Sequence, residues 1–353
     1  MGRIQDFLKR YKTTVDRQVD ITSLDLMTRD PWLNPYMPLQ TYVDYDLMVL
    51  QAKKNKSMAH VVGFTGEIPA SKAGNIGLLE YGLIKLAKSY IYDEEDMKLL
   101  RKWQSNVSGV PDQVRDYFFG TVSDLPMALG DLHLRLTCEA LYSGAIAFQD
   151  NITSQNVALT YTTDSNQYPS ALTTTSRWNQ AATATPIKNL RDHAETFRRT
   201  VKVGNPAATV MNSNTLRQVF DTYEVRDSVS SDLGQLVATG ADNNRVPTLE
   251  EFNQALQRRL APPVLVVDET YEEENADGTT TESFFVPDGY YFLLWNAMGE
   301  RALGPVESND GQAGIYAFTE EVSKEPPVDR SVGVGTGIPL VFDTRKMGGR
   351  KVY

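Results

Sequence analysis

The side-chain types that most often catalyse reactions or bind transition metals are scarce in this sequence and widely separated. The chain has three histidines, His60, His133 and His193, and one cysteine, Cys138. No HExxH, HxxEH or paired CxxC spacing occurs, although zinc sites of the usual type need closely spaced ligands. The Gly-x-Ser-x-Gly turn of many acyl-transfer enzymes is also absent. The sequence therefore predicts no catalytic, cofactor or metal site.

Carboxylates are plentiful, and one dense group of them has the chemistry to hold a hard cation such as calcium. The run Glu272–Glu274 precedes Asp277, but the twelve-residue pattern of a calcium loop is missing. A solvated turn between two strands is the favoured interpretation. A carboxylate-dependent hydrolase that works through acids such as Asp268 and Glu269 stays open as an alternative function.

One glycine-rich segment has the composition of a phosphate-binding loop. It is Gly333-Val334-Gly335-Thr336-Gly337. It lacks the Gly-Lys-Ser/Thr ending, and few residues follow it to form a βαβ unit. No nucleotide site is predicted there.

The overall charge is acidic. Lysine and arginine number 35 against 45 aspartates and glutamates, for a formal charge of −10 and a pI near 5.0. Proteins dedicated to duplex DNA are usually basic, because phosphate contacts dominate their affinity. Contact with DNA is therefore expected to be weak and non-specific, at local basic segments such as Arg345-Lys346 and Arg350-Lys351.

Location is constrained by the same composition. No stretch approaches the roughly 20 apolar residues that cross a bilayer, and the N-terminus lacks a secretory signal core. A single cysteine suits a reducing compartment. We expect a protein that is made in a cytoplasm and has no membrane contact.

The N-terminal residues predict a short amphipathic helix over 1–20, in which Ile4, Phe7, Leu8 and Tyr11 recur at helical spacing. A helix this short is not stable alone in water. It is expected to dock either on its own domain or on a neighbouring subunit. The three prolines within residues 31–38 then predict an extended connector.

Residues 41–68 alternate polar and apolar side chains as strands do, around a basic interruption. They predict a long two-stranded hairpin that includes Phe64 on its return strand, with Pro69 and Gly74 as breakers. The tip carries Lys53, Lys54 and Lys56. An isolated hairpin is marginal in water, so this one must lie on another surface. A solvated tip is the simpler interpretation of the lysines, and pairing with acids of an adjacent subunit is the functional one.

Helical patterns follow from Asp93 to Phe148. The acidic residues 93–96 favour a helix N-terminus, and a long helix is predicted over 122–148 with Asp124 as N-cap and Pro126 near its first turn. Cys138 and His133 fall inside this helix. We predict a buried, inert thiol for Cys138 and a packing or surface role for His133.

An α/β portion follows a polar segment at 151–180 in which residues 157–161 have strand composition. Predicted helices cover 186–199, 213–223 and 249–260, the last opened by a capping box at Thr248. Predicted strands cover 207–211, 264–267, 283–286 and 290–295, and the acidic turn described above joins the second to the third.

This order of elements resembles the HK97-like capsid fold of tailed bacteriophages, an α+β fold. The second half is similar to the lambda-type major capsid protein E family. Four segments carry that similarity: Ala208-Thr209-Val210-Met211-Asn212 with the helix to Phe220, Phe285-Val286-Pro287-Asp288-Gly289, Leu303-Gly304-Pro305-Val306, and Ile338-Pro339-Leu340-Val341. In the first half, Ile68-Pro69 and Ala70-Ser71-Lys72 fall where that family's extended loop returns.

The resemblance implies a structural protein without enzymatic activity. Its copies would form hexamers and pentamers of an icosahedral shell around double-stranded DNA, assembled in the host bacterial cytoplasm and retained in the virion. Scaffolding, portal and decoration proteins are the implied partners. The candidate inter-subunit contacts are Phe7, Leu8, Tyr11, Lys53, Lys54, Lys56 and Phe64.

The resemblance also divides the chain. It implies an N-terminal arm at 1–38, an extended loop at 39–80, a peripheral domain with a spine helix at 81–185, an axial domain at 186–320, and a C-terminal strand segment at 321–353. Besides the hydrolase, a second alternative function stays open, namely another virion component of the tail or of head completion.

Overall fold

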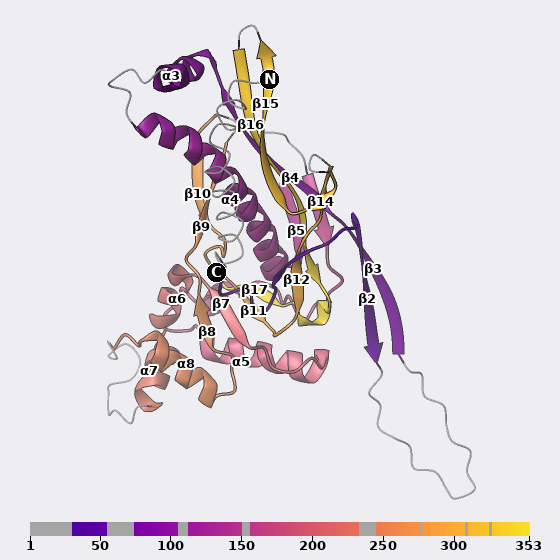
Figure 1. Ribbon diagram of the computed structural model, residues 1–353. Coiled ribbons are helices and arrows are strands. Elements are labelled where there is room, and N and C mark those ends of the chain that lie inside the picture. The colour runs from indigo at the N-terminus through magenta and orange to yellow at the C-terminus, as the bar shows by residue number, and fades with distance from the viewer. Residues whose placement is uncertain are drawn as a thin grey trace, which may run out of the picture.

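A long helix lying on a β-sheet forms one part of the molecule, and a smaller sheet with short helices around it forms the other (Figure 1). The computed structural model describes residues 30–54, 74–104, 112–149, 156–232, 245–275, 277–307, 310–324 and 327–353. Helices and strands both contribute to each part. The predicted α+β class is confirmed.

Strand β16 organises the five-stranded sheet of the first part. It pairs antiparallel with β4 along one side and with β15 and then β12 along the other, and β1 lies parallel to β12. The strands are β1 (Leu39–Thr41), β4 (Ile84–Tyr92), β12 (Gly299–Leu303), β15 (Ile315–Lys324) and β16 (Pro327–Val341). The sheet therefore joins the beginning of the described chain to its end.

Helix α4 (Asp112–Ser143) lies on one face of this sheet, and glycines in β16 allow a close approach. A Cβ added to Gly333 would lie 3.0 Å from the Cβ of Leu125, and one added to Gly337 would lie 3.0 Å from the ring of His133. Larger residues would push the helix away from the strand. The glycine run thus lies in a strand beneath α4 and forms no loop.

The long helix begins earlier than predicted. It starts at Asp112, so the prediction of a start near 122 with Asp124 as N-cap was wrong. Pro126 suggested a first turn because proline has no N–H to donate to the preceding turn. In the structure Pro126 lies inside α4, and the shorter helix α3 (Glu94–Gln104) precedes it with the predicted acidic first turn.

The long helix also ends earlier than the predicted Phe148. Gly144 follows its last residue with a φ of 77°, in the left-handed region, and its N–H donates to the carbonyl of Ala140. Glycine adopts this conformation without strain and commonly terminates helices. Strand β5 (Ala145–Gln149) begins directly afterwards and pairs with β6 (Asn156–Thr160), whose strand character was predicted.

The second part contains a four-stranded sheet in the order β17-β11-β7-β8. Its strands are β7 (Ala208–Met211), β8 (Val264–Val266), β11 (Tyr290–Leu294) and β17 (Gly349–Lys351). The helices are α5 (Pro186–Thr196), continued by a π-helical turn at Phe197–Val201, α6 (Ser213–Phe220), α7 (Tyr223–Asp232) and α8 (Leu249–Arg258). The structure confirms all three predicted helices, with shifts at their ends. It also confirms three of the predicted strands, those at 207–211, 264–267 and 290–295.

Side-chain caps explain why two of these helices begin where predicted. The Asn212 side chain accepts from the N–H of Thr215 at 2.8 Å, at the start of α6. At α8, Thr248 and Glu251 form a reciprocal capping box. Such caps satisfy N–H groups that have no partner within the helix.

The remaining strands form hairpins. They are β2 (Asp46–Lys54) with β3 (Gly74–Gly82), β9 (Thr270–Glu274) with β10 (Thr280–Phe284), and β13 (Pro305–Val306) with β14 (Gln312–Ala313). Two predictions were wrong here. Gly74 was predicted to end the first hairpin, but it is the first residue of the return strand β3. The acidic run at 272–274 was predicted to form a turn, but it lies in β9, and the tight turn follows at 275–279.

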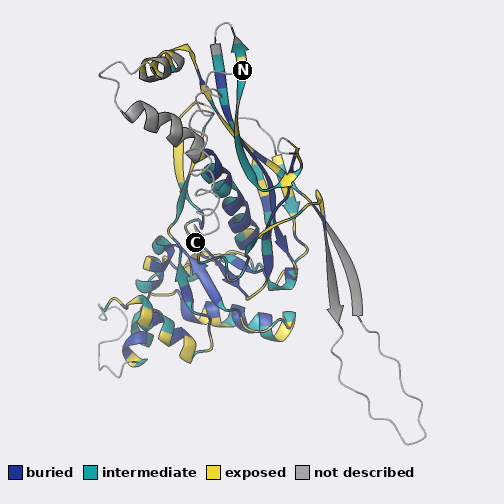
Figure 2. Cartoon of the chain, in the orientation of Figure 1, coloured by how far each residue is buried: buried dark blue, intermediate teal, exposed yellow. Residues whose placement is uncertain are grey.

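Buried side chains form one continuous core under α4 and around the smaller sheet, drawn in dark blue in Figure 2. Trp178 is fully buried and stacks on Tyr291, with ring centroids 5.3 Å apart. Within the described chain no helix has the length and apolar character needed to cross a membrane.

Candidate assembly surfaces

The β2–β3 hairpin stands away from the rest of the molecule (Figure 1). Its two strands form a sheet of their own, and within the described chain neither pairs with another strand. Its base enters the core, where Leu47 and Tyr81 are 6% and 4% exposed. Because two-stranded hairpins are marginal in water, this one needs an additional surface to lie on.

Polar contacts fix the segment that leads into the hairpin to β12 and to the residue after β13. The hydroxyl of Tyr42 donates to Glu300 on β12, and that of Tyr45 donates to Glu307 at 2.8 Å. Burial, reinforced by the hydrogen bond to Glu300, raises the pKa of Tyr42 to about 12. Both hydroxyls therefore stay protonated as donors at neutral pH, and they fix where the hairpin leaves the body.

Only two of the predicted contact residues lie within the described chain. Lys53 and Lys54 are the last residues of β2, opposite Asn75 and Gly74 of β3. They therefore lie at the end of the hairpin that is farthest from its base, as predicted for a tip. The other predicted contacts, Phe7, Leu8, Tyr11, Lys56 and Phe64, lie outside the described residues.

The connector after the predicted arm is anchored by a buried ion pair. Arg301 of β12 contacts Asp30 at 2.6 Å, and the two side chains are 3% and 6% exposed. The guanidinium also donates to the Asn34 side chain at 2.6 Å and to the Met37 carbonyl at 3.2 Å. Nothing in the local sequence pattern distinguished Asp30 or Arg301, because the partners are far apart in the chain.

The two described histidines are buried packing residues. Burial, together with the charge of Arg301, lowers the pKa of His133 to about 3. For His193 burial lowers the pKa to about 4, while Nε2 donates to the Gln167 carbonyl at 3.1 Å and Nδ1 accepts from the Tyr291 hydroxyl at 2.9 Å. Both rings are therefore neutral at pH 7. The packing role predicted for His133 is confirmed.

Cys138 is likewise inert. It is 0% exposed in α4, and burial raises the pKa of its thiol well above the ordinary value. A thiolate, which is the reactive form, is therefore not available at neutral pH. The prediction of a buried, unreactive thiol is confirmed.

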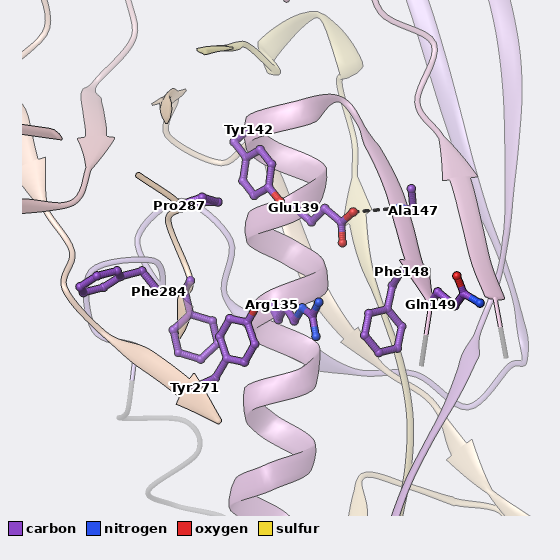
Figure 3. Close-up of a pocket in the computed structure, with 10 residues that line it drawn as sticks. Arg135, Glu139, Tyr142, Ala147, Phe148, Gln149, Tyr271, Phe284 and Pro287 are labelled. Carbon is purple, nitrogen blue, oxygen red and sulfur yellow. Dashed lines mark hydrogen bonds between the residues drawn. The ribbon is translucent and has the colours of Figure 1, made fainter. Parts of the chain in front are cut away.

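A hollow of about 110 Å³ opens between α4, the β5–β6 hairpin and the β9–β10 hairpin (Figure 3). Arg135 reaches from α4 between the rings of Phe148 and Tyr271, with centroid distances of 4.6 and 4.8 Å, and its guanidinium contacts Glu273 at 3.0 Å. The guanidinium is thus held by an ion pair and two aromatic faces. These contacts attach the acidic β9–β10 hairpin to the long helix.

The acids named for a hydrolase have structural partners instead. Asp268 accepts from the N–H of Ser213 at 2.7 Å, and Glu269 accepts from the Trp32 indole at 3.1 Å. Among the residues that the structure describes, no three histidine, cysteine or acidic side chains gather closely enough to hold a metal ion.

Comparison with solved structures finds the same architecture in a protein assigned as a capsid protein of a prophage of E. coli CFT073. The TM-score is 0.55 at 11% identity, over 94% of this chain and 97% of that one. A phage-related protein from Bordetella bronchiseptica RB50 has a TM-score of 0.48 at 9% identity, over 90% of both chains. The SrpI encapsulin of Synechococcus elongatus PCC 7942 has a TM-score of 0.46 at 11% identity, over 91% of this chain and 86% of that one.

No protein-family model matches the chain, and a search of curated proteins finds no relative by sequence. The likeness to the prophage protein covers nearly the whole of both chains and shows a common fold. The chain has the HK97-like capsid fold, as the order of its predicted elements implied. The narrower resemblance to the lambda-type family stays a prediction.

Proposed function

We propose that this chain is the major capsid protein of a tailed bacteriophage, a structural subunit that assembles with copies of itself into a shell. The observation that carries the proposal is the HK97-like fold with its projecting β2–β3 hairpin, which pairs with no other strand of the described chain. A hairpin that cannot be stable alone finds its missing surface when identical subunits repeat by symmetry.

The described elements fit the roles that the resemblance implies. In this proposal, α4 on the five-stranded sheet would be the spine helix and peripheral domain, and the β2–β3 hairpin would be the extended loop. The smaller sheet with α5 to α8 would be the axial domain. The segment from Asp30 to Pro38 would be the end of the arm, and Arg301 of β12 holds Asp30 there.

The assembled form that we propose is an icosahedral shell of hexamers and pentamers around double-stranded DNA. Its formation in a host cytoplasm would require scaffolding and portal proteins, and a decoration protein is a further candidate partner. With a formal charge of −10, the chain would touch DNA only weakly, through local basic residues such as Arg350 and Lys351. No enzymatic role is proposed.

Electron microscopy and sedimentation of the purified protein, expressed with and without its neighbouring genes, test the proposal. Closed shells, tubes or capsomer-sized rings are the expected result. A uniform monomer or dimer under every condition would contradict it. Tail-like particles without closed shells would favour the alternative function, a virion component of the tail or of head completion.

A further inference from the structure

The β9–β10 hairpin extends from the smaller sheet and lies beside α4, so it bridges the two parts of the molecule (Figure 1). Strand β8 leads into β9, and β10 leads into β11. Within the described chain neither β9 nor β10 pairs with any further strand. A two-stranded hairpin is marginal in water, so its order depends on how it is held to the rest of the molecule.

Local hydrogen bonds hold the two ends of this hairpin. At its root the Phe285 N–H donates to the Glu269 carbonyl at 3.1 Å, and the Glu269 side chain accepts from the Trp32 indole at 3.1 Å. At its tip the Asn275 N–H donates to the Thr279 carbonyl at 2.8 Å and closes a tight turn. The hairpin between these ends can therefore move as one unit about its root.

The two faces of the hairpin differ in what they contribute to stability. The register places Glu272 directly opposite Glu282, and both side chains are exposed. Like charges in this arrangement destabilise a strand pair. Side chains alternate along a strand, so Tyr271 and Glu273 lie on the other face, where both contact Arg135 of α4. The face toward α4 is therefore the one that stabilises the hairpin.

Arg135 makes the described contacts on that face (Figure 3). Its guanidinium lies between the rings of Phe148 and Tyr271 and pairs with Glu273 at 3.0 Å, and both charged side chains are 23% exposed. Phe148 belongs to β5, which is tied to α4 because Glu139 accepts a backbone N–H of that strand at 3.0 Å. Arg135 thus joins the hairpin to a surface that is itself fixed.

Packing beside Arg135 is incomplete. The hollow of about 110 Å³ lies next to it, and Phe284 and Pro287 near the root of the hairpin help to line this hollow. Side chains that border an empty space lose dispersion contacts on that side. The contacts of Arg135 therefore provide a large share of the attachment.

We propose that the β9–β10 hairpin is a latched strap, which opens as a unit while the core stays folded, and that Arg135 is its latch. Cooperative opening of one structural unit below the global unfolding free energy is common in folded proteins. Opening would remove one connection between the two parts of the molecule, so the latch sets how firmly they are joined. The proposal concerns the single subunit and does not depend on the proposed function.

Hydrogen exchange of the purified full chain, read by mass spectrometry, measures the opening. Arg135→Met keeps an unbranched side chain between the two rings but removes the charge. Amides of β9 and β10 should then exchange roughly tenfold faster, while those of β7 and β11 in the core keep their rates. Arg226→Met is the control, because it removes another partly buried ion pair, with Asp221 at 2.8 Å, away from this hairpin. It should leave the exchange of β9 and β10 unchanged.

A second variant separates the ion pair from the packing of the side chain. Glu273→Gln should speed the exchange of β9 and β10 by roughly threefold, because the contacts of Arg135 with the two rings remain. Added salt screens a partly exposed ion pair. Raising the salt concentration should therefore speed this exchange more in the parent chain than in the Glu273→Gln chain. Equal salt effects in the two chains would contradict an electrostatic latch.

The remaining outcomes are equally decisive. Unchanged exchange of β9 and β10 in Arg135→Met would overturn the proposal. Equal acceleration in the hairpin and in the core would also overturn it, because Arg135 would then stabilise the fold as a whole. If Arg135→Met does not fold, Glu273→Gln and its salt dependence decide the matter. A parent chain that forms no shells would contradict the capsid function and leave the strap standing.

Discussion

At the scale of single residues, a buried ion pair lies where the connector meets β12. Arg301 makes an ion pair and two further hydrogen bonds in a site that excludes water, so its charge is compensated only while Asp30, Asn34 and Met37 stay in place. A buried pair of this kind adds little net stability over an apolar pair, but removing one member is costly. It therefore specifies one docked position for the connector.

Replacing Asp30 with alanine should lower the free energy of unfolding by about 3 kcal/mol, because Arg301 would remain buried without its counter-ion. Denaturant titration measures the change. Glu94→Ala is the matched control: Glu94 pairs with Lys98 at 3.2 Å, but both side chains are more than half exposed. Its loss should cost less than about 0.5 kcal/mol. Equal effects of the two substitutions would mean that the Asp30 pair is not buried in solution.

Buried neutral histidines make the stability depend on pH. Burial lowers the pKa of His133 to about 3 and of His193 to about 4, from an ordinary value of 6.5. Below pH 6.5 the unfolded chain binds protons that the folded chain does not, so stability falls as the pH falls. Each histidine should contribute a loss of about 1.4 kcal/mol per pH unit between pH 6 and the folded pKa.

Urea titrations between pH 7.5 and pH 5 measure this slope. Above pH 7 both histidines are neutral in either state and should contribute nothing. The variant His133→Asn should lose roughly half of the histidine contribution to the slope, because His193 remains. A variant with the same pH dependence as the parent chain would show that His133 titrates normally in the folded state.

At the scale of elements, local signals determined which predictions succeeded. Helices α6 and α8 begin at Asn212 and Thr248 because a side-chain cap is a local interaction that the sequence displays directly. Strands β7 and β11 were equally clear, since each is a short apolar run buried on both faces. The order of such elements was sufficient to predict the capsid fold.

Predictions failed where distant contacts override a local signal. Pro126 suggested a helix start, but α4 passes through it, and its contact with β16 depends on Gly333, more than 200 positions away. Strand β3 contains three glycines, at 74, 77 and 82, and glycine is a poor strand former. Of the seven candidate contacts, the structure describes only Lys53 and Lys54, and all seven remain predictions as contacts with a neighbouring subunit.

The base of the projecting hairpin offers a test at this scale. Tyr42→Phe and Tyr45→Phe each remove one hydroxyl that donates to a glutamate. Each should lower the stability of the hairpin's attachment to the body by up to about 1 kcal/mol. Because the overall core is untouched, the loss should appear as faster hydrogen exchange in β2 and β3. Tyr316→Phe removes a comparable hydroxyl from a different hairpin and is the control. Equal exchange in all variants would indicate that the tyrosines do not hold the hairpin.

At the scale of the whole molecule, one chain combines a well-packed body with parts that lack partners. The core runs continuously from α4 through the smaller sheet, whereas the β2–β3 hairpin extends beyond it. Such an imbalance is unfavourable in a monomer and favourable in an assembly, where each projecting part of one copy lies on another copy. A contact between the hairpin of one copy and a different surface of the next copy is heterologous, and such contacts generate closed rings or shells where the rotation between copies closes.

The basic tip of the hairpin gives the prediction for assembly. If Lys53, Lys54 and Lys56 pair with acids of an adjacent subunit, replacing all three with glutamate should abolish shell formation, because like charges would then face each other. The isolated subunit should keep its fold, since Lys53 and Lys54 lie at the end of the hairpin away from the body. Particle yield by electron microscopy and circular dichroism of the subunit measure the two effects.

The control for this prediction changes the net charge of −10 by the same amount at three other sites. Lys98, Lys188 and Lys202 are exposed on α3, on α5 and after the π-helical turn, away from the hairpin. With glutamate at these positions shells should still form. If both triple variants fail to assemble, total charge and not the tip controls assembly. If both assemble as well as the parent chain, the tip lysines point into solvent, and the apolar residues of the hairpin must supply its contact with the neighbouring subunit.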